Sequence, residues 1–434
     1  MSRSLRILPD FIPRVKSALQ QKGFARQQDL ANKLDMSLTT VNKYFNAKSV
    51  DYLYFVEISE QLGQDWRKIA AFEDSSSNRG QCNGKGEKEV VMTDCLEEDS
   101  FIYVERPPIE ADCYKAIKQP GALLRIKAPQ KMGKTCLLEQ VLDYARKQGY
   151  QTVKLDLRLA EKTIFADYQT FLQSLCLEVA ESLELEPQLN HYWRELYSLN
   201  KNCTRYWQKY LLPTFDTPLV LALDNFETLF TYPELFDNFC RLLRGWYERA
   251  QEGTSQDNNI WQQLRLVVVH STEVYPELDT NHSPFNVGVA IDLPEFTQKQ
   301  AATLAQHYLK ETELSEPDLQ ELMELVGGHP YLLQQAFLAL SHQNQSLEQL
   351  LGLAPTEEGI FRAHLHQQLW TLQHHSRLEA AYTQVVMGSE PVPLDTEEGF
   401  KLHSLGLVKL SGNNYYPSCN LYREYFSTHL GSTP

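Results

Sequence analysis

The chain has 434 residues, of which 42% are hydrophobic and 22% charged, and a formal net charge of −15. This length predicts more than one domain, and the composition is that of a globular protein. So negative a charge argues against a protein coated with nucleic acid, because duplex binding needs a basic face. The first 75 residues hold 11 Lys or Arg and 9 Asp or Glu, so any nucleic-acid contact is expected there.

Cysteine usage and hydropathy predict a cytoplasmic protein. The eight cysteines are scattered and none forms a Cys-x-x-Cys pair, so the sequence indicates neither a zinc cluster nor a thioredoxin-like site. Scattered cysteines without a signal peptide are typical of reduced thiols in a cytoplasm. No apolar run approaches the ~18–20 residues that span a bilayer, and we expect no membrane partner.

Residues 1–73 predict an all-helical domain. Asp10 can cap a first helix, residues 26–34 place apolar side chains on one face, and Ser37 can cap the next helix. A longer helix is expected over 52–62. Two short helices joined by a tight turn predict a helix-turn-helix.

A flexible linker is expected over residues 74–100, which are rich in Ser, Gly and charge and lack apolar periodicity. Residues 101–295 then alternate short apolar strands with helical patterns, which predicts an α/β core with a parallel sheet. The strands are expected at 123–126, 152–157, 219–223, 264–270 and 287–292. The helices are expected at 136–148, 167–183, 191–210 and 234–251.

The C-terminal third is expected to be mainly helical. Residues 296–355 predict a helical lid domain with helices at 297–310, 315–326, 330–341 and 346–352. In residues 356–434, an apolar strand at 406–410 is followed by the turn residues Ser-Gly-Asn-Asn and by Tyr415-Tyr416. A helix followed by such a hairpin predicts a winged helix.

The strongest motif lies between the first core strand and its helix. Residues 128–135 read Ala-Pro-Gln-Lys-Met-Gly-Lys-Thr, and Gly133, Lys134 and Thr135 supply the end of the phosphate-loop pattern. Ala128 replaces its first Gly. Such a loop binds phosphates through backbone N–H groups and its Lys, and Mg²⁺ through its hydroxyl. The alternative is an ordinary strand-to-helix turn. The predicted nucleotide-binding residues are Ala128, Pro129, Gln130, Lys131, Met132, Gly133, Lys134, Thr135 and Cys136.

A second acidic element is expected about 90 residues downstream. The apolar strand over 219–223 ends in Asp224, which we expect to hold Mg²⁺ together with Thr135; the alternative is a strand-end cap. Many such enzymes carry Glu at the next position to orient water, but here it is Asn225, with Glu227 two residues further. Because Asn cannot act as a base, hydrolysis is expected to be slow, absent or served by Glu227. The catalytic candidates are Lys134, Asp224 and Glu227.

Two further features have both a functional and a structural interpretation. His270, Ser271 and Thr272 end the fourth core strand, where a polar group can contact the γ-phosphate; a structural His is the alternative. The turn Gly327-Gly328-His329-Pro330 is either a helix C-cap followed by Pro at the next helix start or a contact to the base.

Several segments together resemble the AAA-like domain proteins of the STAND class of signalling P-loop ATPases. They are residues 101–107, 126–135, 269–275, 283–288 and 327–332, within a resemblance that spans about 100–430. It implies ATP or ADP as the nucleotide, in a core closed by helical and winged-helix domains. It also implies that Arg106 and Pro330 bind nucleotide and that His403 contacts the β-phosphate.

The N-terminal block resembles the helix-turn-helix domain of vWA-MoxR-associated ternary-system proteins and phage-repressor domains. That likeness implies DNA contacts, and these residue types suit phosphates and base edges. The alternative is an adaptor that docks a partner protein. The residues expected to face DNA are Ser37, Thr39, Thr40, Asn42, Lys43, Asn46 and Lys48.

Three functions compete at this point. The first is a STAND-type ATP/ADP switch with slow or absent hydrolysis, which acts with partner proteins in bacterial signalling or defence. The second is an ATP-dependent DNA-binding regulator that uses the helix-turn-helix. The third is a scaffold that binds nucleotide without turnover, suggested by Ala128 and Asn225. A nucleotide-dependent homo-oligomer and a monomer both stay open.

Overall fold

A computed structural model describes residues 102–430 except 253–258, 272–283, 310–313 and 343–345, together with separate positions between 4 and 71. The chain divides into two compact units, Met1–Val91 and Met92–Pro434, and each is described by itself. The expected linker at 74–100 lies outside the described residues.

The first unit contains strands, so the all-helical prediction is wrong. Strand β1 (Ser4–Ile7) pairs antiparallel with both β2 (Val50–Asp51) and β3 (Ala70–Ala71). The sequence Ser-Leu-Arg-Ile of β1 alternates polar and apolar residues, which is the period of a strand. Helix α3 (Leu38–Phe45) forms where a helix was expected. Its Val41, Tyr44 and Phe45 are buried in a small hydrophobic core.

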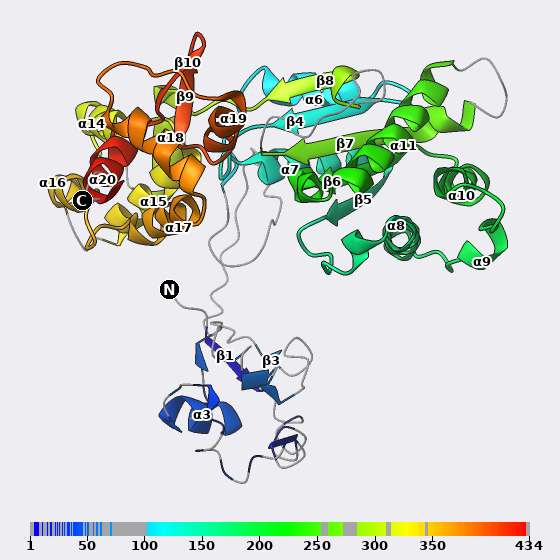
Figure 1. The fold of residues 1–434 in the computed structure, drawn as a ribbon, viewed down its shortest axis with the longest axis horizontal. Coiled ribbons are helices and arrows are strands. Elements are labelled where there is room, and N and C mark those ends of the chain that lie inside the picture. The colour runs from blue at the N-terminus through cyan, green and yellow to red at the C-terminus, as the bar shows by residue number, and fades with distance from the viewer. Residues whose placement is uncertain are drawn as a thin grey trace, which may run out of the picture. The chain divides into compact units, whose positions relative to one another are not determined.

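The second unit is built on a five-stranded sheet in which every pair is parallel. Its order is β5-β6-β7-β4-β8 (Figure 1), so the strand before the phosphate loop, β4, lies between β7 and β8. The predicted parallel sheet is confirmed. The strands are β4 (Leu123–Lys127), β5 (Gln151–Asp156), β6 (Leu219–Asp224), β7 (Leu264–His270) and β8 (Val289–Asp292).

Helices cover both faces of this sheet, which explains why its inner strands β6 and β7 are nearly all apolar. Alternate residues of β6 enter different cores: Leu219, Leu221 and Leu223 enter one, whereas Val220 and Ala222 enter the other. Helices α6 (Ile109–Ile117) and α7 (Lys134–Lys147) cover the second face. The first face is covered by α8 (Tyr168–Ser182), α10 (Leu199–Tyr206) and α11 (Pro233–Glu252).

One helix expected in the core is broken. In place of one helix over 191–210, the chain forms α9 (Leu189–Tyr192), α10 and a π-helical turn, η3 (Trp207–Leu211). The buried side chain of Asn202 bonds to backbone atoms of Arg194 and Tyr197 between the pieces. These bonds satisfy polar backbone groups that a continuous helix would pair internally.

The segments after the core share one hydrophobic core from α13 to α20. Helices form close to each expected position in the lid region, and Thr297, Ser315 and Ser346 begin three of them with capping boxes. The lid helices are α13 (Gln298–Tyr308), α14 (Glu316–Val326), α15 (Pro330–Ser341) and α16 (Leu347–Leu353). After them come α17 (Arg362–Gln373), α18 (Ser376–Met387), α19 (Thr396–Ser404), the hairpin β9 (Val408–Ser411) and β10 (Asn414–Pro417), and α20 (Asn420–Leu430).

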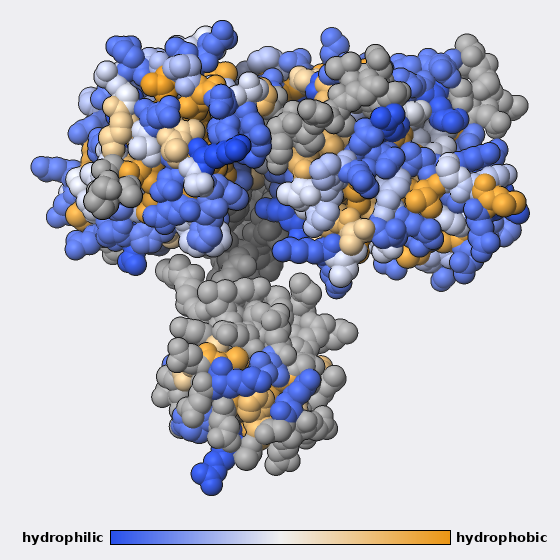
Figure 2. All heavy atoms as spheres, in the orientation of Figure 1, coloured by the Kyte–Doolittle hydropathy of each residue, from blue (hydrophilic) through white to orange (hydrophobic). Residues whose placement is uncertain are grey.

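On the face shown in Figure 2, the described residues are mainly hydrophilic, with small separate apolar patches. Large apolar side chains such as Leu159, Leu196 and Trp370 are exposed singly, which is ordinary for a folded domain. Within the described ranges, no helix combines the length and the apolarity needed to cross a bilayer.

Candidate nucleotide-binding site

The phosphate loop joins β4 to α7, so the N-terminus of a 14-residue helix points into it. Gly133 precedes the helix with φ +91°, a conformation that L side chains rarely adopt. Ala128 is buried, and its φ is not positive. The first position of the pattern therefore needs no glycine here, which explains why Ala is tolerated.

We call residues 133–135 the root of the loop and residues 129–131 its tip. At the root, the buried Nζ of Lys134 donates to the carbonyl oxygens of Ala128 at 2.9 Å and Pro129 at 2.8 Å. Burial lowers the pKa of Lys134 to about 8, against the opposing effect of Glu227 and Asp224. A bound phosphate would favour the charged ammonium.

The two predicted Mg²⁺ ligands, Thr135 and Asp224, are hydrogen-bonded to each other, and their binding of Mg²⁺ stays a prediction. The Thr135 hydroxyl donates to Asp224 Oδ2 at 3.0 Å, and Asp224 is buried at the end of β6. Oxygens on neighbouring corners of an Mg²⁺ octahedron lie about 3 Å apart, so the pair fits two Mg²⁺ ligands. Lys154 is 3.9 Å from Asp224 but bonds more closely to Glu139 at 2.7 Å. Among the described residues, no group of three or more His, Cys, Asp or Glu could hold a metal.

Asn225 and Glu227 take different roles around Asp224. Asn225 has φ +55°, which Asn tolerates better than most residues, and its Nδ2 donates to Asp156 Oδ1 at 2.8 Å. Glu227, in the first turn of η5 (Phe226–Thr231), accepts a hydrogen bond from the Ser271 hydroxyl. Its Oε2 is buried without a hydrogen-bond partner. Glu227 therefore has one carboxylate oxygen available beside Asp224, whereas Asn225 is engaged elsewhere.

Of the strand-end candidates, Ser271 is the one that meets the site through Glu227. His270 is buried, and its ring packs edge-on against Phe285 at 5.3 Å. Phe285 packs against the core on the face opposite α7. A γ-phosphate contact by His270 stays a prediction, and Thr272 lies outside the described residues.

Arg106 connects the phosphate loop to the segment before α13. Its buried guanidinium donates to Met132 O at 2.9 Å and to Pro294 O at 3.0 Å, and stacks on the Phe296 ring at 4.4 Å. Burial lowers its pKa. These contacts join the loop to the segment that leads into α13, and direct nucleotide binding by Arg106 stays a prediction.

The tip of the loop is bonded to the C-terminal helices. The Gln130 N–H donates to Ser404 O, at the end of α19, at 2.9 Å. Lys131 has φ +60°, and its Nζ lies 3.0 Å from His364 Nδ1 in α17. The same ammonium lies 4.1 Å from the centroid of the Tyr331 ring in α15. The tip therefore contacts three helices outside the core.

Burial dominates the electrostatics of this contact. It lowers the pKa of Lys131, and with help from Lys131 and His329 it lowers the pKa of His364 to about 3. His364 Nε2 is hydrogen-bonded to the Tyr422 hydroxyl at 2.7 Å. A neutral His364 can thus accept from Lys131 through Nδ1 while donating to Tyr422.

The Gly-Gly-His-Pro turn between α14 and α15 lies beside this contact. A Cβ on Gly328 would lie 2.2 Å from Phe296 O, so only glycine fits. His329 caps α15 and is buried, and burial followed by Lys131 and Lys409 lowers its pKa to about 3. Pro330 begins α15. His403 directly precedes Ser404 in α19. Base and β-phosphate contacts by Pro330 and His403 stay predictions.

The DNA-contact residues predicted in the first unit can be placed only in part. Asn42, Lys43, Asn46 and Lys48 are exposed, and Thr40 is half-buried. Ser37 and the side chain of Thr39 lie outside the described residues. Helix α3 therefore buries one face and presents polar side chains on the other.

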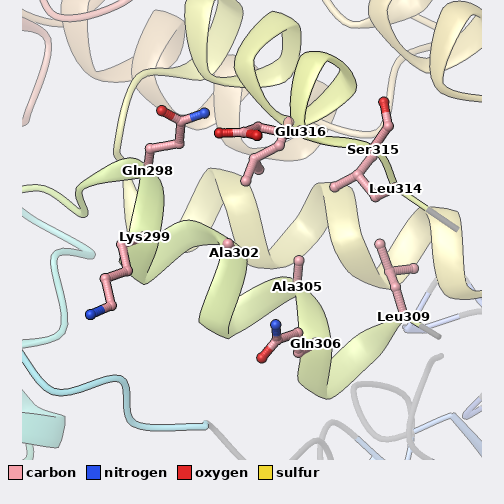
Figure 3. Close-up of a pocket in the computed structure, with 10 residues that line it drawn as sticks. Gln298, Lys299, Ala302, Ala305, Gln306, Leu309, Leu314, Ser315 and Glu316 are labelled. Atoms are coloured by element: carbon pink, nitrogen blue, oxygen red, sulfur yellow. The ribbon is translucent and has the colours of Figure 1, made fainter. Parts of the chain in front are cut away.

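A cavity of about 560 Å³ lies between α13 and α14, away from the phosphate loop. Ala302 and Ala305 line it from α13, together with Leu309 and Leu314 after that helix (Figure 3). None of the predicted site residues lines it, so we do not assign the nucleotide to this cavity.

A phosphate loop with Lys and Thr, on a parallel sheet whose neighbouring strand ends in a buried Asp, defines a P-loop nucleotide-binding fold. A family model described as an AAA-like domain matches residues 91–428. The chain belongs to this family of AAA-like P-loop ATPase domains.

Comparisons with known proteins and solved structures found further similarities. A stretch of 213 residues is 23% identical to a WD repeat-containing protein of Synechocystis; it makes up 47% of this chain but 17% of that protein. A Walker-type ATPase of Pyrococcus abyssi has a TM-score of 0.50 at 12% identity, over 75% of this chain and 96% of that one. Cdc6p of Pyrobaculum aerophilum has a TM-score of 0.41 at 16% identity, over 77% and 97%. At 12% identity, the Pyrococcus abyssi structure indicates the fold alone.

Proposed function

We propose that this chain is a STAND-type ATP/ADP switch, in which the nucleotide at the phosphate loop sets how the C-terminal helices attach to that loop. The observation that carries the proposal is the double attachment of the loop. Its root is bonded within the core through Thr135 and Asp224, and its tip is bonded to α19 and α17 through Gln130 and Lys131.

The proposed nucleotide site uses the chain's own donors at the loop. Backbone N–H groups of residues 130–136 and the Lys134 ammonium would bind the phosphates, and Thr135 with Asp224 would hold Mg²⁺. An Mg²⁺ ion held there would neutralise part of the phosphate charge. Pro330 and His403 flank the tip contacts, and we place Pro330 toward the base and His403 toward the β-phosphate.

The switch would arise because the nucleotide phosphates and the C-terminal helices both bond to the backbone of the tip. A nucleotide shifts the C-terminal helices only if it binds their attached and detached arrangements with different affinities. The Gln130 N–H that bonds to Ser404 belongs to a loop whose amides bind phosphates, so phosphate geometry and helix attachment are linked through the same backbone. We interpret α19 and the β9–β10 hairpin, which a Val392–Tyr415 bridge extends, as a winged helix that moves in this transition.

Slow hydrolysis would reset the switch. Glu227 is the proposed base, since its Oε2 is buried without a partner and a buried carboxylate near a phosphate loop can orient water. Asn225 cannot take this role because its side chain is bonded to Asp156. The output would pass to partner proteins of a bacterial signalling or defence system.

Nucleotide content and phosphate release of the purified chain, beside Lys134→Ala, test this function. Copurified ADP with slow ATP turnover, both lost in the variant, is the expected result. Bound nucleotide without any turnover would support a scaffold in place of a switch. A wild-type chain that binds no adenine nucleotide would overturn the proposal.

A second function, DNA binding by the first unit, is favoured by the polar face of α3. Asn42 and Lys43 are exposed there while Val41 and Tyr44 are buried, and Lys48 is exposed just after the helix. Fluorescence anisotropy with duplex DNA at two salt concentrations would test it. Binding that weakens with salt and is reduced by the Lys43→Ala/Lys48→Ala double variant supports a DNA interface. No binding at low salt would favour a protein-docking role.

A further inference from the structure

Arg158 follows the edge strand β5 and is not part of the phosphate-loop motif. Its side chain is 63% exposed and pairs with the Asp156 carboxylate in a fork, with Nη2–Oδ2 at 3.0 Å and Nε–Oδ1 at 3.3 Å. The Arg158 backbone N–H also donates to Asp156 Oδ1 at 3.0 Å. A single carboxylate therefore accounts for the charge pairing of this arginine.

The Arg158–Asp156 pair lies next to Asp224, the proposed Mg²⁺ ligand. Asp156 and Asp224 are partners in the parallel register of β5 and β6, and Leu157 N–H donates to Asp224 O at 3.1 Å. The carboxyl ends of parallel strands are where this class of fold binds ligands. Arg158 interacts electrostatically with Asp224 and Glu227, and its charge contributes to the lowered pKa of Lys134. The guanidinium is thus within electrostatic range of the loop.

Other cations near the loop are fixed by deeper contacts. Lys134 is buried on two loop carbonyls, Lys154 is bonded to Glu139, and Lys131 is directed to His364 in α17. Arg158 differs from them because it is largely exposed. Asp156 would also keep partners if the guanidinium left it, namely the Asn225 amide and the Arg158 N–H.

We propose that Arg158 distinguishes ATP from ADP by transferring its guanidinium from Asp156 to the terminal phosphate of ATP. This inference rests on the proposed adenine-nucleotide site. A guanidinium binds phosphate oxygens in the same two-point geometry as a carboxylate. ATP brings an additional phosphate for which Asp156 is the competing anion. With ADP, the Asp156 pair persists.

The competition predicts opposite effects for the two partners of the pair. Arg158→Ala removes the phosphate contact, so ATP binding weakens by about tenfold or more while ADP binding changes less than about twofold. Asp156→Asn keeps the acceptor for Asn225 but loses the charge that retains Arg158, so ATP binding tightens several-fold. A purely structural salt bridge would make both variants weaker in the same direction.

The experiment is titration calorimetry of the full chain with Mg²⁺, using ADP and a non-hydrolysable ATP analogue. Arg146→Ala is the matched control, because Arg146 pairs with Asp143 within α7; its ATP-to-ADP affinity ratio should equal that of the wild type. A ratio that falls in Arg158→Ala and rises in Asp156→Asn supports the inference.

Suppose that the wild type binds both nucleotides and that the ATP-to-ADP affinity ratio of both variants equals the wild-type ratio. This result would leave the proposed function standing and overturn the role of Arg158. Equal losses for ATP and ADP in both variants would also overturn it, because they indicate a structural pair. If the wild type binds neither nucleotide, the proposed function itself fails, and with it this inference.

Discussion

At its root the phosphate loop is bonded within the α/β core, whereas at its tip it is bonded to helices that follow the core in the sequence. Lys134 and Thr135 bond to Ala128, Pro129 and Asp224. Gln130 and Lys131 bond to residues that lie more than 230 positions away. The six residues 130–135 thus connect two regions with different roles.

This difference assigns nucleotide binding to the root and the coupling of nucleotide state to the C-terminal helices to the tip. Root residues face the place where phosphates and Mg²⁺ would lie, so changes there should alter affinity and chemistry. The Lys131 side chain contacts the C-terminal helices, so its replacement should alter how nucleotide state is transmitted while leaving affinity nearly intact. The predictions below test this separation, in order of decreasing effect.

The largest effect is expected at Lys134. Lys134→Ala should weaken ATP and ADP binding by about 100-fold or more, because a buried cation bonded to phosphate is lost. Titration with a fluorescent nucleotide measures this. Lys147→Ala, at the exposed far end of the same helix, is the control and should bind like the wild type. Equal binding by both variants would remove the loop from the nucleotide site.

Glu227 should separate turnover from binding. Glu227→Gln keeps the size of the side chain but not its basicity, so phosphate release should fall by about 30-fold or more with nucleotide affinity nearly unchanged. Ser271→Ala, which removes the hydrogen bond to Glu227, should cause a smaller loss. Steady-state phosphate release decides this. Turnover that is undiminished in Glu227→Gln would exclude Glu227 as the base.

Lys131 tests the tip. Lys131→Met loses the contact to His364 but can retain the loop backbone, so nucleotide exchange should accelerate about tenfold while equilibrium affinity changes less than about threefold. Stopped-flow displacement of a fluorescent nucleotide measures the exchange rate. Lys401→Ala, on the surface of α19 and paired with Glu397, should exchange at the wild-type rate. A large loss of affinity in Lys131→Met would contradict a tip that only couples.

Low pH should destabilise the contacts around the tip, because His364 and His329 are buried there. Burial holds the pKa of His364 and of His329 at about 3, below the ordinary 6.5, so the unfolded chain binds more protons between these values. The contribution of each histidine to the free energy of unfolding is therefore fully present above pH 6.5 and is lost as the pH falls. At pH 5.5 the loss is about 1 kcal/mol per histidine. Denaturant unfolding at pH 7.5 and 5.5 measures this. His364→Gln should reduce the pH dependence, whereas His374→Gln, at an exposed position, should retain it.

The sequence predicted the elements that rest on local pattern. Short apolar runs identify the core strands, most clearly β4, β6 and β7. Gly133, Lys134, Thr135 and Asp224 follow from the motif and its spacing. The N-terminal strand β1 was missed because four residues carry little pattern. The break around Asn202 was missed because its cause is a side-chain bond to backbone.

Contacts between distant segments carried no local signal. Neither His364 nor Ser404 stands out in the sequence, and their meeting with the tip depends on the packing of α17 and α19. The conformation of Asn225 is a partial exception. Asn in place of Glu after Asp224 marks a departure, and the left-handed φ of +55° with the bond to Asp156 gives it a physical reason.

The most direct test of the central claim is hydrogen exchange of the full chain with and without ADP or a non-hydrolysable ATP analogue. Peptides covering residues 360–373 and 399–410 report on the helices that contact the tip. The account predicts that their exchange differs between the two nucleotides in the wild type and does not respond in Lys134→Ala. Nucleotide that protects the phosphate loop while leaving both peptides unchanged would contradict coupling through the tip.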